Sequence, residues 1–70
     1  MMKEWGGIYF LKDGKEFAFR SWERVPSKGD WVVFPSTDKP YEVKRVIWRE
    51  TKSAPIYPYV EVVIVAVKQS

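Results

Sequence analysis

The ionisable side chains of this sequence leave few catalytic arrangements open. Its 70 residues include neither histidine nor cysteine, so serine–histidine and cysteine–histidine pairs are excluded, as are histidine and thiolate metal sites. The nine Asp and Glu residues are scattered along the chain, and the four glycines lack the spacing of phosphate-binding loops. We therefore expect no enzyme activity, no cofactor, no metal and no small-molecule substrate.

A metal-independent ribonuclease is the one catalytic alternative. Some toxin ribonucleases with an SH3-like fold, which this chain resembles in size, cleave RNA with arginine and a carboxylate or hydroxyl. The residues available for such chemistry are Arg20, Arg24, Arg45, Arg49, Glu42 and Glu50. Nothing in their spacing requires catalysis, so binding is the stronger hypothesis.

Aromatic and basic side chains are the better candidates for a functional surface. The chain has four Trp, four Tyr and four Phe residues, and its 12 Lys and Arg residues exceed its acidic residues by three. Bases stack on aromatic rings for about 1–3 kcal/mol each, while Lys and Arg contact phosphates. The composition thus permits a nucleic-acid partner without requiring one.

The clearest structural signal lies in WGGIYFLKDGKEFAFRSW, residues 5–22. Asp13-Gly14 between two aromatic-rich segments predicts a two-residue type I′ hairpin turn, because both turn positions need positive φ. Regular pairing from this turn sets Phe10 opposite Phe17 and Trp5 opposite Trp22. Side chains alternate across a strand, so one predicted face is core: Ile8, Phe10, Phe17 and Phe19. The other face carries Trp5, Tyr9, Leu11, Glu16, Ala18, Arg20 and Trp22.

This second hairpin face is the first candidate binding surface. Trp5, Tyr9 and Trp22 would act as stacking elements, with Arg20 as a cationic contact. The alternative is that Trp5 and Trp22 form an ordinary cross-strand pair, partly buried in a bent barrel.

Three further strands are predicted, at 30–34, 41–50 and 59–67, separated by proline-containing loops at 35–40 and 51–58. A bulge at Lys44-Arg45 would bring the apolar residues of the 41–50 strand onto one face, because a bulge adds one residue to one strand. Those residues are Tyr41, Val43, Val46 and Trp48. We expect Trp31 and Trp48 to be core residues.

A string of basic residues is the second candidate surface. If clustered, it would contact phosphates with salt-sensitive affinity; the alternative is a solvated face interleaved with Glu42 and Glu50. Its members are Lys44, Arg45, Arg49 and Lys52, joined by Arg24 and Lys28 from the preceding turn.

The last predicted strand has apolar side chains on both faces. With Glu61 facing water, Val60, Val62, Ile64 and Ala66 point inward. The outward residues Val63, Val65 and Val67 then form an apolar edge, which predicts docking to a second copy or to a host protein.

Five short strands in one small chain predict a single domain over 1–70, an all-β, five-stranded antiparallel SH3-like barrel, with an OB-like barrel as the alternative. RVPSKGDWVVF followed by YEVKRVIW, between Arg24 and Trp48, resembles small SH3-like barrel proteins of bacteriophages and mobile elements. Archaeal chromatin proteins are similar in layout but end in a helix, and EVVIVAVKQS shows no helical periodicity.

The residues and the resemblance together predict a non-catalytic binding module with nucleic acid as its partner. The alternative is a phage-type accessory protein that binds a host protein or forms a homodimer. The longest apolar run, residues 62–67, is far shorter than the roughly 20 residues that span a bilayer. We therefore expect no membrane association and a cytoplasmic location.

Overall fold

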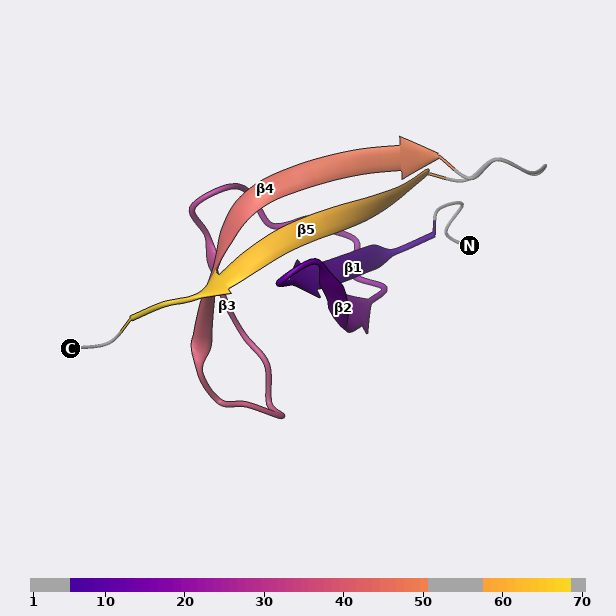
Figure 1. The fold of residues 1–70 in the computed structure, drawn as a ribbon. Helices are drawn as coiled ribbons and strands as arrows, with labels where there is room; N and C mark the ends of the chain where they lie inside the picture. The colour runs from indigo at the N-terminus through magenta and orange to yellow at the C-terminus, as the bar shows by residue number, and fades with distance from the viewer. Residues whose placement is uncertain (1–5, 51–57, 69–70) are drawn as a thin grey trace.

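Five strands form the fold of residues 6–50 and 58–68, which this computed structural model describes (Figure 1). Helices are absent from the described residues, which confirms the all-β prediction. The strands are β1 (Ile8–Lys12), β2 (Lys15–Arg20), β3 (Trp31–Val33), β4 (Pro40–Glu50) and β5 (Pro58–Ala66).

The five strands make one mixed sheet in the order β2-β1-β5-β4-β3. All neighbours are antiparallel except β1 and β5, which pair in parallel from Ile8 opposite Val60 to Leu11 opposite Val63. The prediction of a fully antiparallel sheet was therefore wrong. When an odd number of strands reverse direction one after another, the first and the last strand run the same way. If these two strands pair, their pairing is necessarily parallel.

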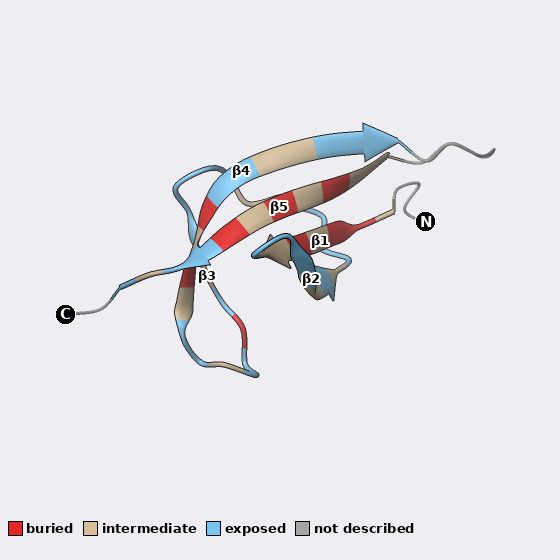
Figure 2. Ribbon diagram, viewed as in Figure 1, coloured by how far each residue is buried: buried red, intermediate tan, exposed pale blue. Residues whose placement is uncertain are grey.

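The sheet curls, and its concave face encloses the core (Figure 2). Figure 2 shows buried segments on β1, on β5 and at the start of β4. Of the predicted inward residues of β5, Val60, Val62 and Ile64 are fully buried. Ala66 is exposed instead, because β1 runs beside β5 only as far as Val63. The buried core consists of Ile8, Phe10, Phe34, Tyr41, Val43, Val60, Val62 and Ile64.

Aromatic packing, and not backbone pairing, closes the curl between the two edge strands. No ladder joins β2 to β3 in the described sheet. Phe34, which follows β3 and is 1% exposed, lies with its ring centroid 5.0 Å from Phe10 and 5.5 Å from Phe17. Tyr41 at the start of β4 is 5.1 Å from Phe17. These contacts hold β2 near the other end of the sheet without hydrogen bonds.

The predicted hairpin turn is confirmed, but its register is not. Asp13 and Gly14 have φ values of 54° and 78°, and Leu11 pairs with Glu16 as predicted. The register then shifts between Leu11 and Phe10, so that Phe10 lies opposite Ala18 and not Phe17.

This bulge changes which β2 side chains face the core. Phe17 and Ala18 both pack against the core, so Ala18 is not on the outer face where regular alternation would put it. The next residue, Phe19, was predicted to be core and is instead 42% exposed. It lies opposite Tyr9, with the two ring centroids 4.9 Å apart.

The bulge predicted in β4 is confirmed. Val43 pairs with Ile64 and Arg45 with Val63, which leaves Lys44 as the extra residue. Val46 packs against the core as predicted.

Both tryptophans predicted as core are exposed, Trp31 by 61% and Trp48 by 60%. Val32 packs inward, so its neighbour Trp31 in the same strand points outward. Trp48 pairs with buried Val60, but the wall opposite its side chain consists of Glu23, Val25 and Pro58, which leave a hollow.

Replacing Phe34 with leucine removes the ring contacts that close the curl. Each aromatic pair is worth about 0.5–1.5 kcal/mol beyond area burial, so we expect Phe34→Leu to lower the free energy of unfolding by about 1–3 kcal/mol. Urea denaturation followed by circular dichroism measures this change. The exposed Phe19→Leu is the control, and an equal loss in both variants would contradict the assignment.

Comparing alanine substitutions at Gly7 and Gly14 separates the cost of backbone strain from the cost of a steric clash. Both have positive φ, 94° and 78°, where an L residue is strained by about 1–2 kcal/mol. A Cβ on Gly7 would lie 2.5 Å from the Phe19 ring, whereas a Cβ on Gly14 would meet nothing within 4 Å. We expect Gly7→Ala to destabilise more than Gly14→Ala in urea denaturation; equal losses would show that the Phe19 ring moves aside freely.

Candidate nucleic-acid interface

The segment between β2 and β3 is held by a hydrogen-bonded turn that docks on β4. The Ser27 N–H donates to Asp30 Oδ2 (2.8 Å), and the Asp30 N–H donates to the Ser27 carbonyl (2.9 Å). The Gly29 N–H donates to the Val43 carbonyl (2.9 Å), while the Val43 N–H donates to the Asp30 carbonyl (2.8 Å). Because Val43 immediately precedes the β4 bulge, the turn brings Lys28 beside the bulged residues.

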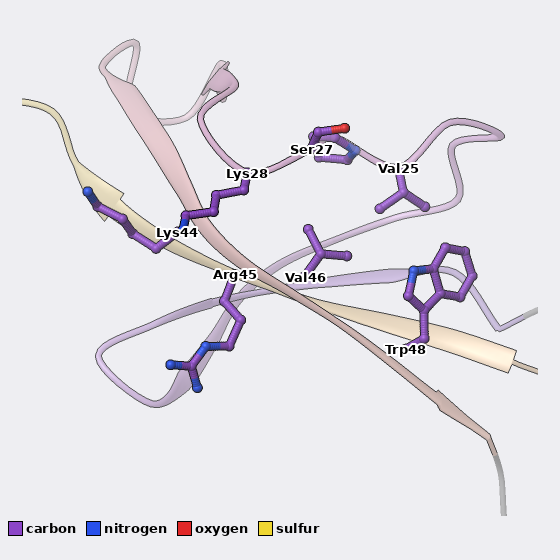
Figure 3. A pocket seen from close by; sticks show the side chains of 8 residues that line it. Val25, Ser27, Lys28, Lys44, Arg45, Val46 and Trp48 are labelled. Atoms are coloured by element: carbon purple, nitrogen blue, oxygen red, sulfur yellow. The ribbon is translucent and has the colours of Figure 1, made fainter.

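A hollow of about 640 Å³ lies between this segment and β4, and we call it the basic hollow (Figure 3). Figure 3 shows Lys28 and Lys44 at one end, Val25 and Trp48 at the other and Val46 between them, while Arg45 points away from these side chains on the other side of β4. Pro26 and Ser27 complete its lining. The basic hollow therefore has a cationic wall and an apolar, aromatic wall.

The cationic wall is only partly neutralised. Lys44 Nζ lies 3.4 Å from Glu42 Oε2, in a solvent-exposed pair of the kind that contributes little energy. Within the described part of the chain, Lys28 and Arg45 have no ion-pair partner. All three cations are exposed, so the wall can attract an anion without first breaking a buried ion pair.

A second hollow, of about 630 Å³, lies on the other side of residues 25–27, and we call it the tryptophan hollow. Trp22 is 41% exposed and its ring centroid is 5.6 Å from Phe10, so one edge of the indole rests on the core. Arg24 lines the same hollow and has no ion-pair partner among residues 6–50 and 58–68. Its lining is Trp22, Arg24, Val25, Pro26, Ser27, Asp30 and Trp31–Val33.

The first predicted surface is not assembled as one face. The β2 bulge leaves Tyr9 on the outer side, where its ring centroid is 4.9 Å from Phe19 and 5.7 Å from Tyr59. Arg20 is on the inner side, with its guanidinium carbon 5.2 Å from the centre of the Phe34 ring. Trp22 also contacts the core, and Trp5 lies outside the described residues.

The predicted basic string is brought together in part. Lys28, Lys44 and Arg45 line the basic hollow, and Arg24 lines the adjacent tryptophan hollow. Arg49 does not join them, because its Nε–H donates to Glu61 Oε1 of β5. This hydrogen bond, with the attraction of the carboxylate, raises the pKa of the Arg49 guanidinium. Lys52 lies outside the described residues.

The residues that the sequence offered for ribonuclease chemistry make separate contacts in different parts of the structure. Arg20 packs over Phe34, Glu42 pairs with Lys44, and Arg49 pairs with Glu61. Arg24 and Arg45 line different hollows.

Sequence reasoning missed Trp31 and Trp48 as surface residues. A signal for Trp31 was present, because Val32 and Phe34 both belong to the core and alternation then directs Trp31 outward. The exposure of Trp48 has no comparable local signal, since Val46, two residues earlier, packs against the core.

The outer face has a smaller, acidic hollow of about 350 Å³, bordered by Tyr9, Tyr59, Glu16 and Glu61. Its carboxylates disfavour an anionic ligand, so the two hollows beside residues 25–27 are the better anion sites. In the described ranges, no group of three acidic residues is placed to hold a metal ion.

The architecture defines a small all-β protein with a basic and aromatic surface along residues 22–28 and β4. Searches against protein-family models, curated proteins and solved structures gave no significant match. No helix among the described residues has the length and apolar character needed to cross a membrane.

Proposed function

We propose that this protein is a non-catalytic binding module for nucleic acid, acting in the cytoplasm. The observation that carries the proposal is the meeting of exposed cations with an exposed indole in one hollow, namely Lys28, Lys44 and Trp48. Cations attract the phosphates, and the indole offers a flat face for a base.

The expected affinity is modest. Stacking supplies about 1–3 kcal/mol per base, and four of the described basic residues, Arg24, Lys28, Lys44 and Arg45, border the two hollows. Sequence-independent binding of this kind has dissociation constants of about 10⁻⁴ to 10⁻⁶ M at physiological salt and tightens as salt is lowered. Such a module suits attachment to a larger nucleic-acid complex.

We also propose kinship with the small SH3-like barrel proteins of phages and mobile elements. The stretch from Arg24 to Trp48 that carries the resemblance supplies nearly all residues around both hollows. The curled sheet supports the proposal, whereas the parallel pairing of β1 with β5 departs from the antiparallel barrel expected for that family.

Charge removal at the basic hollow tests the proposed function. Titration of oligonucleotides at low salt, followed by tryptophan fluorescence, should give saturable quenching. Lys28→Ala should weaken binding about two- to fivefold, as for loss of one exposed ion pair, and make the slope of log K against log salt less steep by about 0.7–0.9.

Lys15→Ala is the matched control, because Lys15 is exposed in the distant hairpin and makes no ion pair with the described residues. Equal weakening by both variants would indicate attraction to net charge alone. No quenching at low salt in the unmodified protein would overturn the proposal.

A protein-interaction module is the second candidate function, and an apolar row on the outer face favours it. Trp31 lies opposite Glu42, which lies opposite Val65, so the three share one face of the sheet. Trp31, Val33 and Val65 are 61%, 55% and 39% exposed. Of the predicted association edge, Val63 and Val67 are half-buried and Val65 is exposed.

If the protein self-associates through this row, it forms a dimer that a charged side chain introduced into the row should disrupt. Sedimentation velocity over a range of protein concentrations should show a concentration-dependent dimer, and Val65→Lys should shift it to monomer because a lysine would be buried in an apolar contact. Lys68→Ala, exposed just beyond β5, is the control. A strict monomer at every concentration would remove the self-association form of this candidate.

A further inference from the structure

We infer that the ligand is a single-stranded nucleic acid, whose backbone follows the cationic wall of the basic hollow while successive bases occupy the basic and tryptophan hollows. This inference rests on the proposed nucleic-acid function and specifies its ligand. The observation behind it is the arrangement of the two hollows on either side of residues 25–27.

The division of the basic hollow into two walls matches one unpaired nucleotide. In a nucleotide the phosphate and the base lie on opposite sides of the sugar. Figure 3 shows the same separation in the protein, with Lys28 and Lys44 across from Trp48 and Val25. A base resting on Trp48 would leave its phosphate facing the cations.

A duplex fits this arrangement less well. Bases in a duplex are stacked on one another and present only their edges in the grooves, so no base face is available to Trp48. Extruding a base from a duplex costs a few kcal/mol, which is comparable to the stacking energy that one indole returns. A single strand binds without that penalty.

The second hollow provides a position for a neighbouring base. It shares Val25, Pro26 and Ser27 with the basic hollow, so the two are adjacent. Trp22 borders it together with Arg24, repeating the combination of ring and cation.

The ridge between the hollows is already ordered by the turn at residues 27–30. The hydrogen bonds between Ser27 and Asp30 hold the turn together, and it is held on β4 because the Gly29 N–H donates to the Val43 carbonyl and the Val43 N–H donates to the Asp30 carbonyl. Binding therefore requires little further ordering of this segment, which favours affinity.

Fluorescence anisotropy with labelled oligonucleotides of about 12 nucleotides tests the inference. The probes are oligo(dT), oligo(rU) and a duplex of equal length. We expect either single strand to bind at least about tenfold more tightly than the duplex, since the duplex lacks about 1–3 kcal/mol of stacking per base. A preference between the two single strands identifies the sugar that the site favours, and either preference supports the inference.

Variants that lack one tryptophan ring show where the bases stack. Trp48→Ala and Trp22→Ala should each weaken single-strand binding by about five- to 100-fold, and Trp48→Phe should recover much of the loss because a stacking face remains. Phe19→Ala removes an exposed ring from the outer face and should leave affinity unchanged. Circular dichroism checks that each variant is folded.

The failures of the two proposals are distinguishable. Duplex binding as tight as single-strand binding, with Lys28→Ala still weakening both, overturns the single-strand inference and leaves nucleic-acid binding intact. Binding of neither probe overturns both. Single-strand binding that responds to Trp48→Ala but not to Trp22→Ala overturns the two-hollow path, because only one base position would then exist.

Discussion

The packing of Phe34, which follows β3, against β2, a strand that shares no ladder with β3, is the contact on which the rest of the structure depends. Its ring meets Phe10 of β1 and Phe17 of β2, and Arg20 of β2 lies over it. These contacts draw together the two edges of the curled sheet. The connecting segment must then cross the open side of the curl, and both hollows lie along it. A core contact of one ring thus positions the surface that we propose to be functional.

Two bulges adapt the sheet to this closure and decide which side chains reach solvent. The extra residue at Phe17 lets both Phe17 and Ala18 pack inward, and it directs Phe19 outward. The extra residue at Lys44 falls beside the turn that Gly29 anchors on Val43. The bulge therefore delivers adjacent cations to the basic hollow while Tyr41, Val43 and Val46 remain on the core side.

Charge is distributed unequally over the surface. On the outer face Glu61 pairs with Arg49 and borders an aromatic hollow together with Glu16. Beside the basic hollow, Lys28 and Arg45 are without ion-pair partners among the described residues. A net charge of only +3 is therefore compatible with a locally cationic surface, because the pairing of charges, and not their sum, sets the local potential.

Local patterns in the sequence determined the Asp13-Gly14 turn, the strand positions, the inward valines of β5 and the bulge at Lys44, because each depends on neighbouring residues. The β2 bulge depends on what packs against Phe17 from a distant segment. Local sequence patterns therefore could not predict that Ala18 packs inward and Phe19 faces outward. The exposure of Trp48 reflects the absence of a full opposing wall, and the separation of Arg49 from the other cations reflects a partner on β5. Those outcomes belong to the tertiary structure, since contacts between residues far apart in the chain decide them.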